Sequence, residues 1–215
     1  MNKIKVELLH ITPMETIANA IANPYNKDKF RENPEQTLKT IKNICLNNNG
    51  TERHGSVLEH IVTQWEIIGS SRLELQEHMR HRIASPTVKS SRYTLKELVT
   101  IDHDFKKLFV YPPENLFKDK DSYSLFIDQY NKAIRNFINF LGSCEYIETN
   151  ERLADIVKYM IPEGLRTRFT WTINLRSLLN FIRLREDKNA HFEIRHIAKL
   201  IKEKLNETYV KKLLD

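Results

Sequence analysis

RHRIASPTVKSSRY, residues 80–93, is the stretch from which the rest of the chain is best interpreted. Four cationic side chains and five side-chain hydroxyls lie within these fourteen residues. Guanidinium groups bind the oxygens of a phosphate in pairs, and hydroxyl and backbone amide groups complete the shell around it. The segment therefore predicts a functional loop that binds an anion. The alternative at this point is an ordinary basic surface loop.

The sequence on both sides of this loop predicts a small sheet with long helices. Alternating polar and apolar residues indicate strands, whereas apolar residues at helical spacing indicate amphipathic helices. The predicted strands are residues 3–9, 61–68 and 169–173. The predicted helices are residues 13–22, 34–46, 73–81, 121–141, 152–160, 174–185 and 192–214, and the predicted loops are 23–34 and 83–94. We expect an α+β fold in a single domain, residues 1–215, with a small antiparallel or mixed sheet packed against long helices.

Composition limits the classes of protein that the chain can belong to. Its 215 residues, 40% of them hydrophobic, suffice to bury a sizeable core. The formal net charge of +6 fits phosphorylated small molecules, nucleic acid or simply a solvated surface. The two cysteines, Cys45 and Cys144, form no CxxC pair, which favours a reducing, cytoplasmic setting. Neither a signal-peptide core nor an apolar run of about 20 residues is present, so we expect no membrane segment.

The 80–93 segment resembles the signature RHRxxSxNxxSxRY of flavin-dependent thymidylate synthases. Seven of the eight fixed positions match, and Thr87 stands where the signature has Asn. The matching residues are Arg80, His81, Arg82, Ser85, Ser90, Arg92 and Tyr93. Residues 54–60, HGSVLEH, resemble the H-x4-EH block of the same family. Residues 174–185 resemble its Asn-x-Arg-Ser-x-x-Asn-Phe-x-x-Leu-Arg block, and the order and approximate spacing of the three blocks also agree.

The resemblance implies an enzyme that converts dUMP to dTMP. FAD would be the cofactor, methylenetetrahydrofolate the one-carbon donor and NADPH the reductant. The resemblance also implies a homotetramer whose active sites are shared between subunits, with no role for nucleic acid. The implied FAD contacts are His54, Ser56, Glu59, Arg80, His81, Arg82, Asn174, Arg176, Asn180, Leu184 and Asn189. The implied dUMP contacts are Glu77, Arg80, Val88, Lys89, Ser90, Ser91, Arg92, Lys158 and Arg185.

Arg185 is the residue that we expect to act in catalysis. A guanidinium beside N3 of the uracil ring favours the deprotonated or enolised ring, which makes carbon 5 more nucleophilic. Arginine stays charged at any working pH, as this role requires. Neither Cys45 nor Cys144 lies in a recognisable site motif, so the hydride is expected to come from the flavin without a cysteine nucleophile.

Several alternatives remain open from the sequence. Glu77 is placed either to accept a hydrogen bond from the ribose or to form a plain ion pair with Arg80. The spacing of His54, Glu59 and His60 is not a standard zinc spacing, so no metal site is predicted. The pI of about 9.2 also fits a basic nucleic-acid-binding protein, but no RNP, helix-turn-helix or zinc-finger pattern occurs. A non-catalytic nucleotide-binding relative is the third alternative.

Three positions depart from the family pattern. Besides Thr87, Lys158 stands where the family often has Arg, and Asn189 stands where many members have His. Lysine keeps the charge at position 158 but not the bidentate fork. Asparagine can still donate and accept hydrogen bonds at position 189. We interpret these changes as marks of a divergent subgroup.

Overall fold

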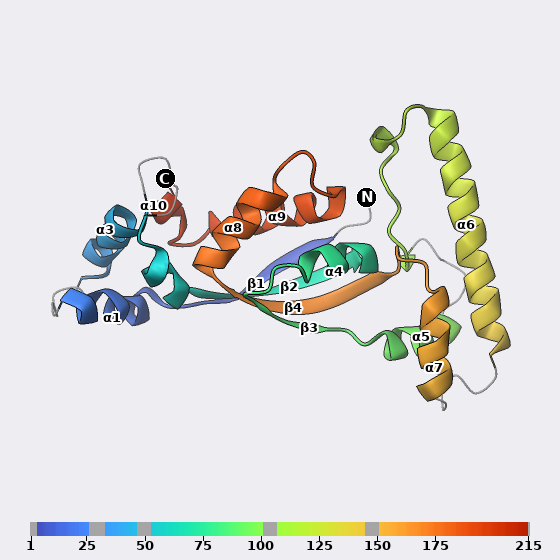
Figure 1. The fold of residues 1–215 in the computed structure, drawn as a ribbon, viewed down its shortest axis with the longest axis horizontal. Helices are drawn as coiled ribbons and strands as arrows, with labels where there is room; N and C mark the ends of the chain where they lie inside the picture. Colours follow the sequence, from blue (N-terminus) through green and yellow to red (C-terminus); the bar gives the residue numbers. More distant parts are fainter. Residues whose placement is uncertain (1–3, 26–32, 47–52, 101–106, 145–150, 215) are drawn as a thin grey trace. The chain divides into compact units, whose positions relative to one another are not determined.

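The computed structural model describes residues 4–25, 33–46, 53–100, 107–144 and 151–214 (Figure 1). Contacts within the chain group its residues into two compact units. Unit 1 consists of residues 1–4, 68–76 and 88–169, and unit 2 consists of residues 5–67, 77–87 and 170–215. Three strands and one helix contribute residues to both units. That the whole chain forms one domain stays a prediction.

The sheet has four antiparallel strands in the order β1-β2-β4-β3, which confirms the predicted α+β class (Figure 1). Their bounds are Lys5–Ile11 for β1, Val62–Ser71 for β2, Ser85–Val88 for β3 and Arg166–Asn174 for β4. In β2, Thr63, Trp65 and Ile67 are buried in alternation, as one covered face of a sheet requires. The Trp65 ring N–H donates to the Thr63 hydroxyl at 2.8 Å, and that hydroxyl donates to the Ile173 carbonyl at 2.9 Å. These buried polar groups are therefore satisfied.

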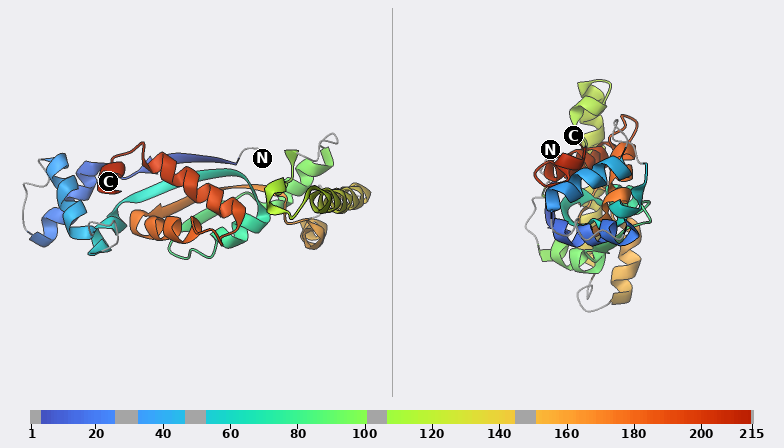
Figure 2. Two further views of the ribbon diagram at one scale, coloured as in Figure 1. Left: turned by 90° about the horizontal axis from the view of Figure 1, so that it is seen from above. Right: turned by 90° about the vertical axis from the view of Figure 1, so that its left-hand side faces the viewer.

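Unit 2 contains the helices at both ends of the chain. They are α1 (Met14–Tyr25), α3 (Pro34–Cys45), the 3-10 helix η1 (Gly55–His60), α8 (Leu175–Arg185), α9 (Phe192–Leu205) and α10 (Lys211–Leu214). Helix α8 packs against α9 and η1, while α9 packs on β1 (Figure 2). The predicted apolar stripe of the last long helix is buried there, at Ile194, Ile197, Ala198, Ile201 and Leu205. This packing fixes α8, which carries the candidate site residues Arg176, Asn180, Leu184 and Arg185.

Unit 1 contains the longest helix, α6 (Lys120–Ser143), close to the predicted 121–141. The other helices are α5 (Ser91–Thr100), α7 (Glu151–Val157), and the 3-10 helices η3 (Glu114–Leu116) and η4 (Lys158–Met160). Asp119 caps α6, because its side chain accepts a hydrogen bond from Ser122 N at 2.8 Å. The core joins α5, α6 and α7 through Leu95, Leu98, Phe109, Ile134, Phe137, Leu141, Ala154, Val157, Ile161 and Leu165.

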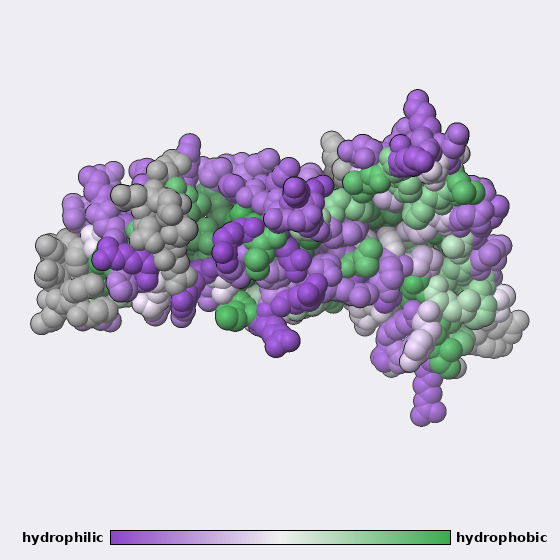
Figure 3. Space-filling model, turned by 45° about the horizontal axis from the view of Figure 1, so that its top comes forward, coloured by the Kyte–Doolittle hydropathy of each residue, from purple (hydrophilic) through white to green (hydrophobic). Residues whose placement is uncertain are grey.

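Unit 1 also leaves several large apolar side chains exposed. They include Leu116, Leu125, Ile156, Tyr159 and Met160. Apolar surface, in green, is visible over this unit in Figure 3. Apolar groups gathered in this way are more common at surfaces that another chain covers than on isolated monomers.

The predicted loop at residues 83–94 is wrong in two places. Residues 85–88 form β3, and a helix, α5, begins at Ser91. The strand depends on pairing with β4, which is distant in the sequence, so the local sequence did not reveal it. Directly after β3, Lys89 N donates to the carbonyl oxygen of Arg168 in β4 at 2.8 Å. The helix start follows from Ser90, whose hydroxyl accepts a hydrogen bond from Arg92 N at 3.3 Å in the manner of an N-cap.

Other predicted boundaries also shift. The helix expected over 73–81 is α4 (Arg72–His78), so the signature begins beyond its end. The helix expected over 192–214 is interrupted between Leu205 and Lys211. There the Thr208 hydroxyl donates to Leu205 O at 2.7 Å and accepts from Val210 N at 3.1 Å, which replaces helical hydrogen bonds. The expected loop at 23–34 falls largely on residues 26–32, outside the described residues.

Gly164 provides a test of packing in unit 1. A Cβ at this position would overlap the Tyr130 hydroxyl and lie 3.2 Å from the Val110 carbonyl oxygen, to which Tyr130 donates. We expect Gly164→Ala to lower the free energy of unfolding by about 1–3 kcal/mol, measured by denaturant titration. The control is Gly142→Ala in α6, where a Cβ meets nothing within 4 Å. It should leave stability unchanged or raise it by up to about 1 kcal/mol, and equal losses in both variants would contradict this packing.

Candidate functional site

A cleft of about 810 Å³ in unit 2 is lined by residues from all three sequence blocks. Its walls come from η1, from residues 80–83 after α4, and from the start and end of α8. The lining residues are Glu59, Arg80, His81, Arg82, Ile83, Ile173, Asn174, Arg176, Ser177, Asn180, Leu184 and Arg185. Segments that are more than 100 residues apart in the chain thus share one cavity, as Glu59 and Arg176 demonstrate. A volume of this size is typical of small-molecule and cofactor sites.

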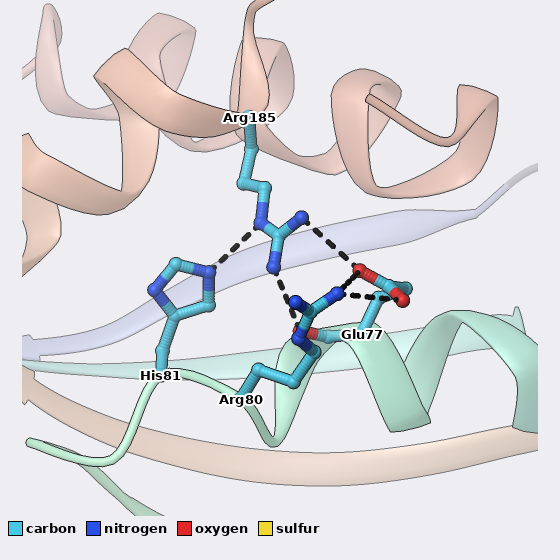
Figure 4. Close-up of polar contacts among 4 residues, drawn as sticks. All are labelled: Glu77, Arg80, His81 and Arg185. Atoms are coloured by element: carbon cyan, nitrogen blue, oxygen red, sulfur yellow. Dashed lines mark hydrogen bonds and ion pairs between the residues drawn. The ribbon is translucent and has the colours of Figure 1, made fainter. Parts of the chain in front are cut away.

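Arg185 is held from two sides at the edge of this cleft (Figure 4). Its Nε donates to His81 Nε2 at 2.9 Å. Its two terminal nitrogens donate to Glu77 Oε2 at 3.1 Å and to the Glu77 carbonyl oxygen at 3.2 Å. Only 16% of the Arg185 side chain is exposed, so this arrangement is partly shielded from water. The guanidinium is therefore fixed in place before any ligand binds.

Glu77 binds a second guanidinium, that of Arg80. Arg80 Nη1 lies 3.1 Å from Glu77 Oε1 and 3.0 Å from Oε2 (Figure 4). The ion pair that the sequence left as one of two alternatives is therefore formed. Because 69% of the Arg80 side chain is exposed, this pair contributes little to stability, and the Arg80 guanidinium can exchange it for a ligand anion.

His81 is kept neutral by its surroundings. Burial, and then the positive charge of Arg185, lower its pKa from 6.5 to about 4. The ring packs edge-on against Phe181 of α8, with centroids 4.8 Å apart. Phe181 in turn contacts His78 and Trp171, which belong to the buried part of unit 2.

Three more of the predicted residues lie at the N-cap and in the first two turns of α8. Asn174 caps the helix, since its side chain accepts from Ser177 N at 2.9 Å. Arg176 Nη1 donates to Glu59 Oε1, which joins α8 to η1 across the cleft. Asn180 accepts from Arg183 Nη2 at 2.9 Å. Amide and guanidinium groups from one helix therefore face the same cavity.

A second group of predicted residues lies in unit 1. Arg92 binds Asp155 through two hydrogen bonds, Nε to Oδ1 at 3.1 Å and Nη2 to Oδ2 at 2.7 Å. Lys158 Nζ also donates to Asp155 Oδ1, at 2.6 Å. Hydrogen bonds from Arg92 and Lys158 lower the pKa of Asp155 to about 2. This carboxylate therefore brings together two predicted phosphate ligands, and sequence reasoning missed it although it lies three residues before Lys158.

The chain was compared with known proteins. The family model described as thymidylate synthase complementing protein matches residues 7–209. A flavin-dependent thymidylate synthase of Wolinella succinogenes is 36% identical over 93% of this chain and 92% of its own length. One from Campylobacter jejuni is 40% identical over 73% of this chain and 72% of its own length. The chain belongs to the flavin-dependent thymidylate synthase family.

A solved structure agrees with this family assignment. The crystal structure of thymidylate synthase X from Helicobacter pylori with FAD and dUMP matches with a TM-score of 0.76 and 28% sequence identity. The match covers 99% of this chain and 98% of that chain. The fold is therefore that of a flavin-dependent thymidylate synthase along nearly the whole chain.

Not all predicted contacts of this flavin-dependent thymidylate synthase line the cleft. His54 and Ser56 line a separate pocket of about 220 Å³, together with apolar residues of α1 and α3. Asn189 is exposed in the turn between α8 and α9, where its N–H donates to Asp187 Oδ1 at 2.8 Å. Val88 ends β3 and is half-buried. The roles of these residues stay predictions.

Two kinds of feature are absent from the described residues. Among them, no group of three or more His, Cys, Asp or Glu side chains is placed to hold a metal ion. In the same part of the chain, no helix has the length and apolar character that crossing a membrane requires.

The neutral state of His81 predicts how stability changes with pH. Below pH 6.5 the unfolded chain takes up a proton on this residue, whereas the folded chain does so only near pH 4. The unfolded state then binds more protons, so stability falls as the pH falls through this window. We expect the melting temperature of the wild type to decrease more steeply between these values than that of His81→Gln, which cannot titrate. Parallel curves in thermal unfolding would contradict the assigned protonation state.

Proposed function

We propose that this protein converts dUMP to dTMP with bound FAD, with methylenetetrahydrofolate as the one-carbon donor and NADPH as the reductant. The observation that carries the proposal is the meeting of η1, the 80–83 segment and α8 at one cleft in unit 2. Membership of the flavin-dependent thymidylate synthase family supports the same reaction.

The residues of the cleft fit FAD. Arg80, Arg82 and Arg176 are cations suited to a pyrophosphate, and the amides of Asn174 and Asn180 can bind the polar edges of a ring system. Apolar side chains between these polar groups suit a flat aromatic ring; they are Ile83, Ile173 and Leu184. Bound FAD supplies the hydride chemistry that no protein side chain provides. His54, Ser56 and Asn189 are proposed as further FAD contacts.

Arg185 is proposed to activate the pyrimidine. Its guanidinium is charged at any working pH and is held in a partly buried position. Placed against N3 and a flanking carbonyl of uracil, it would stabilise the negative charge that develops on the ring. Glu77 lies beside it, so that its remaining acceptor capacity can serve a hydroxyl of the nucleotide.

The phosphate of dUMP is proposed to bind where α5 begins. Ser90 and Ser91 supply hydroxyls, and the first amides of the ten-residue helix α5 point toward an anion at its N-terminus. Arg92 and Lys158 add two cations that Asp155 already holds together. Val88 and Lys89 are proposed to contribute backbone groups.

No cysteine is proposed to act as a nucleophile. Cys45 is fully buried on α3, and Cys144 lies at the C-terminal end of α6. Neither lines the cleft that contains Arg185.

The assembly and location of the enzyme are also proposals. A homotetramer with active sites shared between subunits is consistent with the exposed apolar side chains of unit 1, such as Leu125 and Ile156. We propose a cytoplasmic location and a single-domain chain, as expected from the sequence.

The experiment that tests this function measures two products. Purified protein with FAD, dUMP, NADPH and methylenetetrahydrofolate should form dTMP and oxidise NADPH, and omission of dUMP should slow NADPH oxidation. A nucleotide-binding relative without catalysis would bind dUMP and form no dTMP. A nucleic-acid-binding module would bind neither FAD nor dUMP, and it would be colourless because it holds no flavin.

A further inference from the structure

The hydrogen bonds that Arg185 makes within the protein use only some of its N–H donors. A guanidinium has five N–H donors. Among the described residues, Arg185 uses one on His81 and two on Glu77. Two donors therefore remain for a ligand, and the direction in which they point is set by the three bonds already made.

The bond to His81 requires one particular form of the imidazole. Arginine can only donate, so His81 Nε2 must accept and carry no proton. The ring proton then lies on Nδ1, and this neutral form persists through the working pH range because the pKa is lowered to about 4. A protonated His81 would turn a second donor toward the guanidinium and break the contact. The Nδ1 proton is not used by this bond and can serve the flavin nucleotide.

Helix α8 holds His81 from two successive turns. The Phe181 ring and the His81 ring pack edge-on with their centroids 4.8 Å apart, and Arg185 lies four residues further along the same helix. Side chains four apart project from the same side of a helix. The imidazole is therefore fixed between an aromatic ring and a guanidinium, both of which belong to one rigid element.

The charges around His81 favour the neutral ring. Besides burial, the cations Arg185 and Arg80 lower the pKa of His81, and the carboxylate of Glu77 between them raises it by a smaller amount. His78 is the other titratable group that acts on His81, and its charge would also disfavour protonation. With His81 neutral, the group of Glu77, Arg80, His81 and Arg185 carries one net positive charge, which suits an electron-rich pyrimidine edge.

We propose that His81 is a positioning residue, whose unprotonated Nε2 orients the Arg185 guanidinium for the pyrimidine. The proposal rests on the proposed function, because it assigns His81 to the step in which Arg185 acts. It differs from the role that the family resemblance implies, which is contact with the flavin alone. Its energetic basis is a partly buried hydrogen bond to a charged group, which is stronger than a neutral one.

Two amide variants of His81 distinguish the effect of a hydrogen-bond acceptor at the position of Nε2 from the effect of the imidazole ring itself. The oxygen of Gln in His81→Gln reaches the position of Nε2, whereas the oxygen of Asn in His81→Asn falls one bond short. With FAD saturating, we expect His81→Asn to raise the dissociation constant of dUMP at least about tenfold and to lower kcat. His81→Gln should stay within about threefold of the wild type. His10→Asn, at an exposed position of β1, is the matched control and should change neither quantity.

The same experiment distinguishes a failure of the role inferred for His81 from a failure of the proposed function. An active wild type with equal dUMP affinity in His81→Asn and His81→Gln would overturn the inference and leave the proposed function standing. A wild type that forms no dTMP would overturn the proposed function and the role of His81 with it. If the Asn variant does not fold, nitrogen NMR of labelled histidine in the intact wild type decides the question. A proton on Nδ1 is expected, and a proton on Nε2 would overturn the inference.

Discussion

Arg185→Ala is expected to lower the rate of dTMP formation by about 100-fold or more while the protein keeps its FAD. The variant removes the only charge that we place against the uracil ring, and it removes a group that is held by three hydrogen bonds before substrate arrives. A preorganised charge in a partly buried site stabilises a developing anion far more than a mobile one in water. The measurements are turnover at saturating dUMP and the flavin absorbance of the purified variant.

The matched control for this prediction is Arg183→Ala. Arg183 lies on the same helix, but it is exposed and bonded to Asn180. It should show near-normal turnover with FAD bound. Near-normal dTMP formation by Arg185→Ala would remove Arg185 from the mechanism, whatever the control does.

Arg92→Ala is expected to have the second-largest effect, and mainly on substrate binding. Loss of a charge-assisted bidentate partner for the phosphate should raise KM for dUMP by about 10- to 100-fold, with a smaller change in kcat. Deoxyuridine has no phosphate, so its weak binding should change little. Steady-state kinetics with both compounds measure this difference.

Arg135→Ala is the control for the phosphate prediction. Arg135 is an exposed arginine of α6 in the same unit, so it changes the net charge equally without touching the start of α5. Its KM for dUMP should equal that of the wild type. A fall in kcat with unchanged KM in Arg92→Ala would show that Arg92 does not bind the phosphate.

Periodicity in the sequence was sufficient to predict most elements. The apolar spacing that gives α6 and α9 is local, and the structure confirms α6 within a few residues of its expected bounds. It also confirms the start of α9 at Phe192, whereas the end expected at 214 is wrong because α9 stops at Leu205. The alternation that predicted a strand at 61–68 is the burial pattern of β2, with Trp65 at its centre. Where a signal depended on distant pairing, as for β3, the local sequence was not sufficient.

The candidate site was also predictable from the sequence only in part. Residues 80–93 and the α8 block predicted which residue types matter, and most of the predicted contacts of unit 2 line one cleft. The bonds that position them were not predictable, because Arg185 and Glu77 are 108 residues apart and their contact depends on the fold. Asp155 was missed for a related reason, since its importance arises only from its contact with Arg92, 63 residues away.

The most direct test of this account is a titration of FAD-free protein with FAD, with dTMP formation as the readout. All other substrates are held at saturation. We predict that the FAD-free protein forms no dTMP and that the rate rises with FAD until the sites are filled. Formation of dTMP at an undiminished rate without FAD would contradict the claim that a bound flavin, and not a side chain of the protein, carries out the reduction.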